Sequence, residues 1–374
     1  MRKEILPLTS LRGVAAMAVI AMHFSATMQQ IASGDFPSLA PHGALAVDVF
    51  FILSGFIMGY TYLDSFRTQS IWTANRNFLG KRAARILPLN GAVTIVVTVA
   101  ALLSLWLVDV NLVPTVRPDH VPLDVLTNLL LLPGLGIGRS LNWPAWSISV
   151  EFAAYFAFPV FLFCVFNRNR FVFAATCAAA LAGLYACLGP NLGIVGLHNH
   201  PWPWRDLLRC VSEFVLGLAV FRVYVSHVAA ALFARDDVVL AVSAVIVAIV
   251  LLNLPEFLAM LLFPALILSL ALNQGWVAWF MSLRFLHFLG KISFSLYLVT
   301  DPFRWPLQHL VRTLHPAPLP PLLAMGLAAI FAFSMVLPAW ISYTLIESPG
   351  RFALRGLLSR RNKSAVAFSS KTGP

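Results

Sequence analysis

The sequence predicts an all-α integral membrane protein, a polytopic bundle of about ten transmembrane helices with both termini in the cytoplasm. Three observations carry this prediction. Of the 374 residues, 59% are hydrophobic and only 11% are charged. The mean hydropathy is +0.82, and the apolar residues fall into separate runs. A soluble domain has about 25% charged residues, and a membrane crossing needs about 20 apolar residues.

The apolar runs and the basic residues between them predict the topology. With the N-terminus inside, the inner segments hold 19 Lys and Arg residues and the outer segments hold six. Because cytoplasmic segments carry the excess of Lys and Arg, both chain ends are expected in the cytoplasm. The runs lie near residues 8–28, 43–63, 86–108, 146–166, 171–188, 207–226, 238–253, 256–273, 285–300 and 321–345.

The runs indicate one membrane domain over residues 1–350, followed by a basic cytoplasmic tail over residues 351–374. The tail begins as an amphipathic helix suited to anionic headgroups, and its end is expected to be disordered. An apolar stretch at 123–138 is too short and interrupted for a crossing, so an interfacial or re-entrant helix is expected there. The net charge of +11 comes from Lys and Arg residues that flank the apolar runs and are not gathered on a soluble domain. The expected partner is therefore the lipid bilayer, and nucleic acid is not expected.

Two ionisable residues stand in the first run, Arg12 near its start and His23 deep within it. Ionisable groups at membrane depth are costly and mark functional sites by default. Eleven residues are about three helical turns, so both side chains share one face, about 16 Å apart along the axis. This spacing suits a long anionic donor that enters at Arg12 and reacts at His23. The alternative is a snorkelling anchor and a packing histidine.

Asp48 lies near the outer end of the second run, and Glu151 lies about one turn into the fourth. Asp48 should be level with His23 and could orient its imidazole; the alternative is an aspartate that starts a helix. Glu151 needs a partner at membrane depth, either His23 or an arginine such as Arg139 or Arg209. A structural ion pair is the alternative for Glu151.

Arg82 and Arg85 stand three residues apart before the third run and share a helix face. This fork suits phosphate oxygens, although a topological role is the alternative. Arg209 and Glu213 are four residues apart and are expected to pair with each other. Glu347 ends the last run. No C-x-x-C or H-E-x-x-H motif is present, so a metal site is not expected.

Seven motifs in order resemble the acyltransferase-3 family of membrane O-acyltransferases, which includes bacterial enzymes that acetylate exopolysaccharide and O-antigen. They span residues 8–349, and the chain departs from the family pattern at one point. Thr300 stands where relatives often have a histidine, which leaves Asp301 as a possible substitute. The motifs are R-x10-H from Arg12 to His23, DVFFILSGF at 48–56, R-x-x-R-x-x-P at 82–88, WSISVE at 146–151, R-x3-EF-x2-G at 209–217, GKISFSLYL at 290–298 and IESP at 346–349.

The resemblance implies transfer of an acyl group, typically acetyl, from cytoplasmic acyl-CoA to a hydroxyl of a surface carbohydrate or lipid-linked glycan. It also implies a multi-pass protein of the bacterial inner membrane, and a homo-oligomer is possible. Arg12, Arg82 and Arg85 are expected to bind the CoA phosphates, and His23 to act as general base or to be acylated. Asp48 or Glu151 would hold the imidazole. Substrate contacts are expected from Trp146, Ser147, Tyr155 and Tyr297.

Two other functions are compatible with the sequence. A carrier or flippase for a glycolipid or acyl group would use the same buried charges as a polar path without chemistry. A structural subunit of an export complex would leave Arg12, His23 and Glu151 without a reason to be buried. Consumption of acyl-CoA separates the enzyme from both alternatives.

Overall fold

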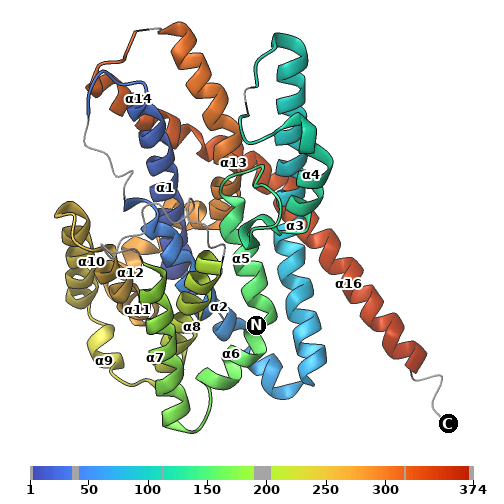
Figure 1. Ribbon diagram of the computed structural model, residues 1–374. Helices are drawn as coiled ribbons and strands as arrows, with labels where there is room; N and C mark the ends of the chain where they lie inside the picture. The colour runs from blue at the N-terminus through green and yellow to red at the C-terminus, as the bar shows by residue number, and fades with distance from the viewer. Residues whose placement is uncertain (1–2, 36–41, 112, 189–203, 316, 370–374) are drawn as a thin grey trace.

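The computed structural model describes residues 3–35, 42–111, 113–188, 204–315 and 317–369, and these ranges form a helix bundle without strands (Figure 1). The predicted all-α class is confirmed. The helices are α1 (Leu6–Gln29), α2 (Leu45–Thr68), α3 (Ile71–Val108), α4 (Val121–Leu129), α5 (Ala145–Phe156), α6 (Phe158–Val165), α7 (Arg170–Cys187), α8 (Trp204–Ser226), α9 (Ala230–Phe233), α10 (Asp236–Leu251), α11 (Glu256–Leu272), α12 (Trp276–Met281), α13 (Arg284–Leu314), α14 (Pro321–Ser334), α15 (Val336–Ser342) and α16 (Ser348–Ser369).

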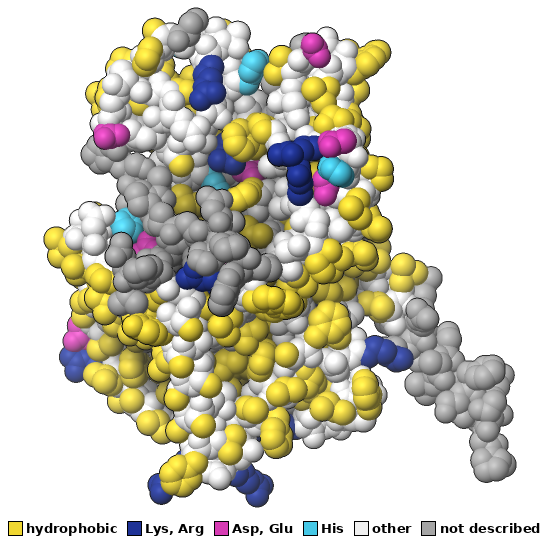
Figure 2. Space-filling view, viewed as in Figure 1, with side chains coloured by type: hydrophobic (Ala, Val, Ile, Leu, Met, Phe, Trp, Pro, Cys, Tyr) yellow, Lys and Arg dark blue, Asp and Glu magenta, His cyan; other side chains and the backbone are white. Residues whose placement is uncertain are grey.

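Each of the ten predicted runs is helical, but fewer helices pass a strict test of length and apolarity. Five described segments pass, and the bent pair α5–α6 makes six if it is one span broken by 64°. Helix α11 is apolar but has 17 residues. Figure 2 shows hydrophobic side chains over the middle and lower part of one face, with Lys and Arg at its lower edge. The described chain is therefore a membrane helix bundle, and the count of ten crossings stays a prediction.

The start of one helix differs from the sequence-based expectation, whereas the short helix within 123–138 and the helix at the start of the tail agree with it. Helix α3 begins at Ile71, so Arg82 and Arg85 lie well inside a 38-residue helix that continues through Pro88. The stretch at 123–138 contains the nine-residue α4, which is too short to cross. The tail continues the last run as α16. Residues 370–374, where disorder was predicted, lie outside the described ranges.

Helices α1 and α13 run parallel and in close contact. A side chain on Gly13 would collide with the backbone of Gly290, so only glycine allows this approach. Near the other end of the pair, the Gln308 side-chain amide donates a hydrogen bond to the Gln30 side chain, with N and O 3.0 Å apart. These two contacts fix which residues of the two helices are level with each other.

Helices α2 and α8 cross at two facing glycines. A methyl group on Gly55 would collide with the carbonyl oxygen of Phe214, and one on Gly217 with the carbonyl oxygen of Ile52. Small residues at such crossings let helix backbones approach closely in a membrane. The crossing brings the Asp48 end of α2 against α8.

Gly217→Ala is expected to destabilise the protein by about 1–3 kcal/mol, because the added methyl must push two helix backbones apart. The thermal unfolding midpoint of the purified protein in detergent measures this loss. Gly326→Ala is the matched control, since nothing lies within 4 Å of a Cβ at that helical position. An equal midpoint for the two variants would contradict the tight crossing.

Candidate active site

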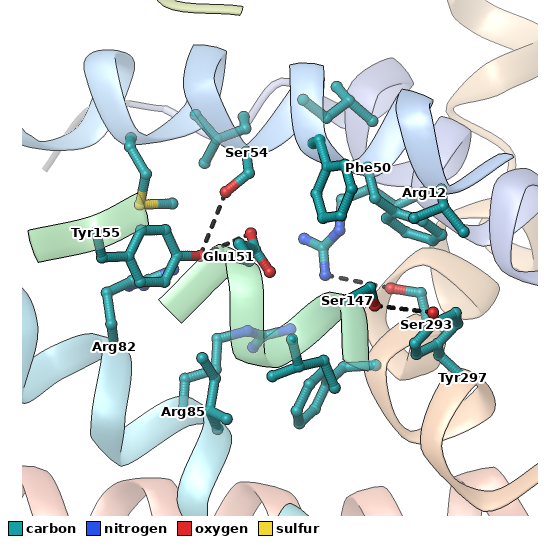
Figure 3. Close-up of a pocket in the computed structure, with 18 residues that line it drawn as sticks. Arg12, Phe50, Ser54, Arg82, Arg85, Ser147, Glu151, Tyr155, Ser293 and Tyr297 are labelled. Carbon is teal, nitrogen blue, oxygen red and sulfur yellow. Dashed lines mark hydrogen bonds between the residues drawn. The ribbon is translucent and has the colours of Figure 1, made fainter. Parts of the chain in front are cut away.

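Five helices enclose a cavity with an empty volume of about 860 Å³. Its walls are apolar side chains of α2 and α13 together with a group of charged and hydroxyl side chains (Figure 3). The polar lining residues are Arg12 of α1, Ser54 of α2, Arg82 and Arg85 of α3, Ser147, Glu151 and Tyr155 of α5, and Ser293 and Tyr297 of α13.

The three arginines predicted to bind phosphate all line this cavity. Arg12 Nη2 donates a hydrogen bond to Ser293 Oγ, 3.2 Å away. Arg82 Nη2 donates to the Tyr62 hydroxyl at 3.4 Å. Arginines from α1 and α3, 70 residues apart in sequence, therefore point into one space.

Arg85 is held by a carboxylate that the sequence did not assign to it. Arg85 Nη1 lies 3.3 Å from Glu347 Oε1, and Glu347 is fully buried. Ser295 Oγ donates to Glu347 Oε2 at 2.7 Å. The charge of Glu347 near the end of the last apolar run was visible in the sequence, but its partner on α3 was not.

Glu151 faces the cavity and is bonded within its own helix. The Tyr155 hydroxyl donates to Glu151 Oε1 at 2.7 Å, and Ser54 Oγ lies 3.2 Å from the same hydroxyl. The negative charge of Glu151 attracts the guanidinium groups of both Arg12 and Arg82. Of the partners expected for this carboxylate, Arg139 is exposed on a loop and Arg209 is paired elsewhere.

A second hydroxyl pair lies one helical turn beyond Ser293 on α13. Ser147 Oγ and the Tyr297 hydroxyl are 2.8 Å apart, and the Phe50 ring centroid is 6.1 Å from that of Tyr297. Trp146, also predicted to contact substrate, is not among the described lining residues and packs edge-on against Phe51.

Asp48 is bound by α8. Arg209 Nε donates to Asp48 Oδ1 at 2.6 Å, both residues are fully buried, and Glu213 lies beside them without solvent exposure. The pair expected within α8, Arg209 with Glu213, is therefore corrected to a pair between α8 and α2. The reason is the glycine crossing, which brings α2 close enough to compete for the guanidinium. The geometry supports a structural role for Asp48.

His23 is half-buried on α1 and is not among the described residues that line the cavity. It is 11 residues from Arg12 and seven from Gln30, which are about three and two full turns, so all three share one face. Arg12 and Gln30 both bond to α13. Counting from the contact of Gly13 with Gly290, the parallel register places His23 level with residues 300–301.

Residues 300–301 begin a polar group that sequence reasoning only partly found. Asp301 is buried, and its Oδ2 accepts a hydrogen bond from the backbone N–H of Trp143 at 3.1 Å. Arg304 Nε lies 2.9 Å from Asp301 Oδ1. The sequence pointed to Asp301 as a possible substitute for a family histidine, while Arg304, one turn further, was counted only as a topology charge.

A sequence model of the acyltransferase-3 family, described as an acyltransferase domain, matches residues 7–343. The chain belongs to this family. The matched range contains every described residue that lines the cavity. The family is the one that the seven motifs predict.

One curated relative is the acyltransferase MdmB of Streptomyces mycarofaciens, which is 30% identical over 236 residues. The match covers 57% of this chain and 56% of the relative, so the chain spans about half the length of the curated relative it matches. No solved structure matches the protein.

Proposed function

We propose that this acyltransferase moves an acetyl group from cytoplasmic acetyl-CoA to a hydroxyl of a cell-surface or exported carbohydrate, in a bacterial inner membrane. The observation that carries the proposal is the convergence of Arg12, Arg82 and Arg85 on one cavity. Three guanidinium groups face two carboxylates there, Glu151 and Glu347, which leaves an excess of one positive charge. Phosphate oxygens are the natural complement of such a group.

The cavity suits a donor that enters with its reactive end first. The phosphates of CoA bind the arginines of α3 and α1, and the pantetheine arm extends along α1 toward His23. Arg12 and His23 are about 16 Å apart along the helix axis, a distance that the extended pantetheine arm of CoA would span. Tyr297 and Ser147 lie between these two levels, so the arm passes their hydroxyl pair.

His23 carries the chemistry in one of two ways. As general base, its imidazole takes the proton of the acceptor hydroxyl while the hydroxyl oxygen attacks the thioester carbonyl. The carbon–sulfur bond breaks, CoA leaves as the thiolate, and the proton returns to sulfur. As nucleophile, the imidazole is acylated first and the acceptor hydroxyl then takes the acyl group. Ser147 is the hydroxyl donor for the developing oxyanion in this scheme, because the Tyr155 hydroxyl already donates to Glu151 beside the arginines.

Asp301 takes the place first given to Asp48 in this scheme. Each of these buried carboxylates has an arginine partner, Arg209 for Asp48 and Arg304 for Asp301, and the α1–α13 register puts Asp301 at the level of His23. A carboxylate at that level favours the imidazolium that forms during proton transfer. Glu151 stays in the donor cavity, where it accepts a hydrogen bond from Tyr155 and its negative charge acts on Arg12 and Arg82.

The decisive experiment incubates membranes that contain the protein with acetyl-CoA labelled in the acetyl group. The expected result is release of free CoA and label on the polysaccharide fraction, both absent from membranes without the protein. Movement of glycolipid or acetyl groups without CoA consumption would instead make the protein a carrier. Mass spectrometry of surface glycans from a deletion strain then names the acceptor, because the lost mass identifies the acyl group and its sugar.

A further inference from the structure

Helices α3 and α16 form an antiparallel pair at one end of the bundle. Gly350 of α16 packs on Pro88 of α3, and Leu358 of α16 packs on Gly80 of α3. Eight residues separate the two contacts on each helix, so the register holds over two turns. In Figure 1, α16 leaves the bundle beside α3 and runs out to the C-terminus.

This register adds two arginines to the arginines of α3. Arg351 is level with residue 87 and Arg355 with residue 83, so each is within a turn of Arg85 or Arg82. The electrostatic interactions agree with this register. Arg355 is close enough to Arg351, Arg82 and Arg85 to be repelled by their positive charges, and Arg85 is repelled by Arg351. Glu347 pairs with Arg85, so this group of four arginines still holds more positive than negative charge, and such a surplus stabilises bound anions.

The pair extends past the cavity. Arg82 and Arg85 line it, while Arg351 and Arg355 are not among the described lining residues. Helix α3 has 38 residues and would be about 57 Å long, against a hydrocarbon core of about 30 Å. Its polar first half therefore reaches beyond the lipid, and α16 packs on that half. The two arginines of α16 thus lie beside Arg82 and Arg85, at about the same level along α3 but outside the described lining of the cavity.

We propose that Arg351 and Arg355 of α16 form a second phosphate subsite, which binds the 3′-phosphate of the nucleotide end of CoA. The inference rests on the proposed function and deepens it by naming the form of the donor. CoA carries a pyrophosphate and, beyond it on the ribose, a 3′-phosphate. With the pyrophosphate at Arg82 and Arg85, the arginines of α16 lie beside it and are the nearest described arginines outside the cavity lining for the 3′-phosphate.

The subsite distinguishes between thioester donors. A phosphopantetheine arm on a carrier protein presents a single phosphate diester, which Arg82 and Arg85 satisfy alone. Free CoA presents three phosphates, and the two rows of arginine match this larger charge. Anionic lipid headgroups share the phosphate chemistry and could also meet α16 at the membrane surface. The test separates these sources.

The experiment measures binding of CoA and of 3′-dephospho-CoA to the purified full-length protein by calorimetry, which needs no acceptor. The wild-type protein is expected to bind CoA at least tenfold more tightly than it binds 3′-dephospho-CoA. In R351Q/R355Q the affinity for CoA should fall about tenfold and the affinity for 3′-dephospho-CoA should stay the same, which brings their ratio near one. Arg351→Lys with Arg355→Lys should recover part of the preference, because lysine retains the charge.

Arg170→Gln is the matched control, since it removes an exposed arginine at the start of α7 and should leave the ratio unchanged. Equal loss of both ligands in R351Q/R355Q, or a loss seen only with anionic lipid present, would assign these arginines to lipid or to folding. Equal wild-type affinity for both ligands would overturn the subsite and leave the donor proposal intact. A wild-type protein that binds neither ligand would overturn the proposed function as well.

Discussion

His23→Ala is expected to reduce acyl transfer by about 10²–10⁴-fold, the usual contribution of a positioned acid–base group. The donor should bind as in the wild-type protein, because Arg12 lies about three turns away along α1 and Arg82 and Arg85 lie on α3. The variant should fold, since His23 is half-buried and the contacts that join α1 to α13 lie elsewhere on the helix. Release of CoA from acetyl-CoA measures the rate, and calorimetry measures donor binding.

The control for this variant is His309→Ala, which removes an exposed histidine from α13. It should keep the wild-type rate. If His23→Ala transferred acetyl groups at that rate too, the imidazole would have no part in the reaction. Label retained on the wild-type protein after donor alone, and absent from His23→Ala, would identify an acyl-histidine intermediate rather than a general base.

Arg209→Leu is expected to destabilise the protein by about 3–5 kcal/mol, because it leaves the carboxylates of Asp48 and Glu213 buried with no compensating cation. The thermal unfolding midpoint in detergent and the yield of monodisperse protein should both fall. The physical cause is desolvation: a charge that has lost its partner must be neutralised or exposed by moving α8 away from α2.

Two further variants test the explanation. Arg312→Leu removes an exposed arginine and should change stability by less than about 0.5 kcal/mol. Asp48→Asn combined with Arg209→Leu should be less destabilised than the sum of the single changes, because the two groups interact directly. If Arg209→Leu gave a stable protein without activity, the ion pair would not be needed for folding, and Asp48 would have a role in catalysis.

The sequence was enough for properties that depend on neighbouring residues. Ten apolar runs became helical segments because hydrophobic length and helix propensity are local. Arg12 and His23 were placed on one face from the 3.6-residue period alone. The fork of Arg82 and Arg85 followed from the same rule, and both line the cavity. The start of α3 was misplaced because its first 15 residues are polar and helical, and hydropathy reports only the part in lipid.

Only the tertiary structure decided which charges meet. From the sequence, Arg209 was expected to pair with Glu213, and Asp48 to orient His23. In the structure, α2 and α8 cross at Gly55 and Gly217, and this crossing brings Asp48 into an ion pair with Arg209. Likewise Arg85 takes Glu347, 262 residues away, as its partner. Such pairs depend on how far helix backbones can approach and in what register. Contacts between side chains distant in sequence set both, and no local pattern records them.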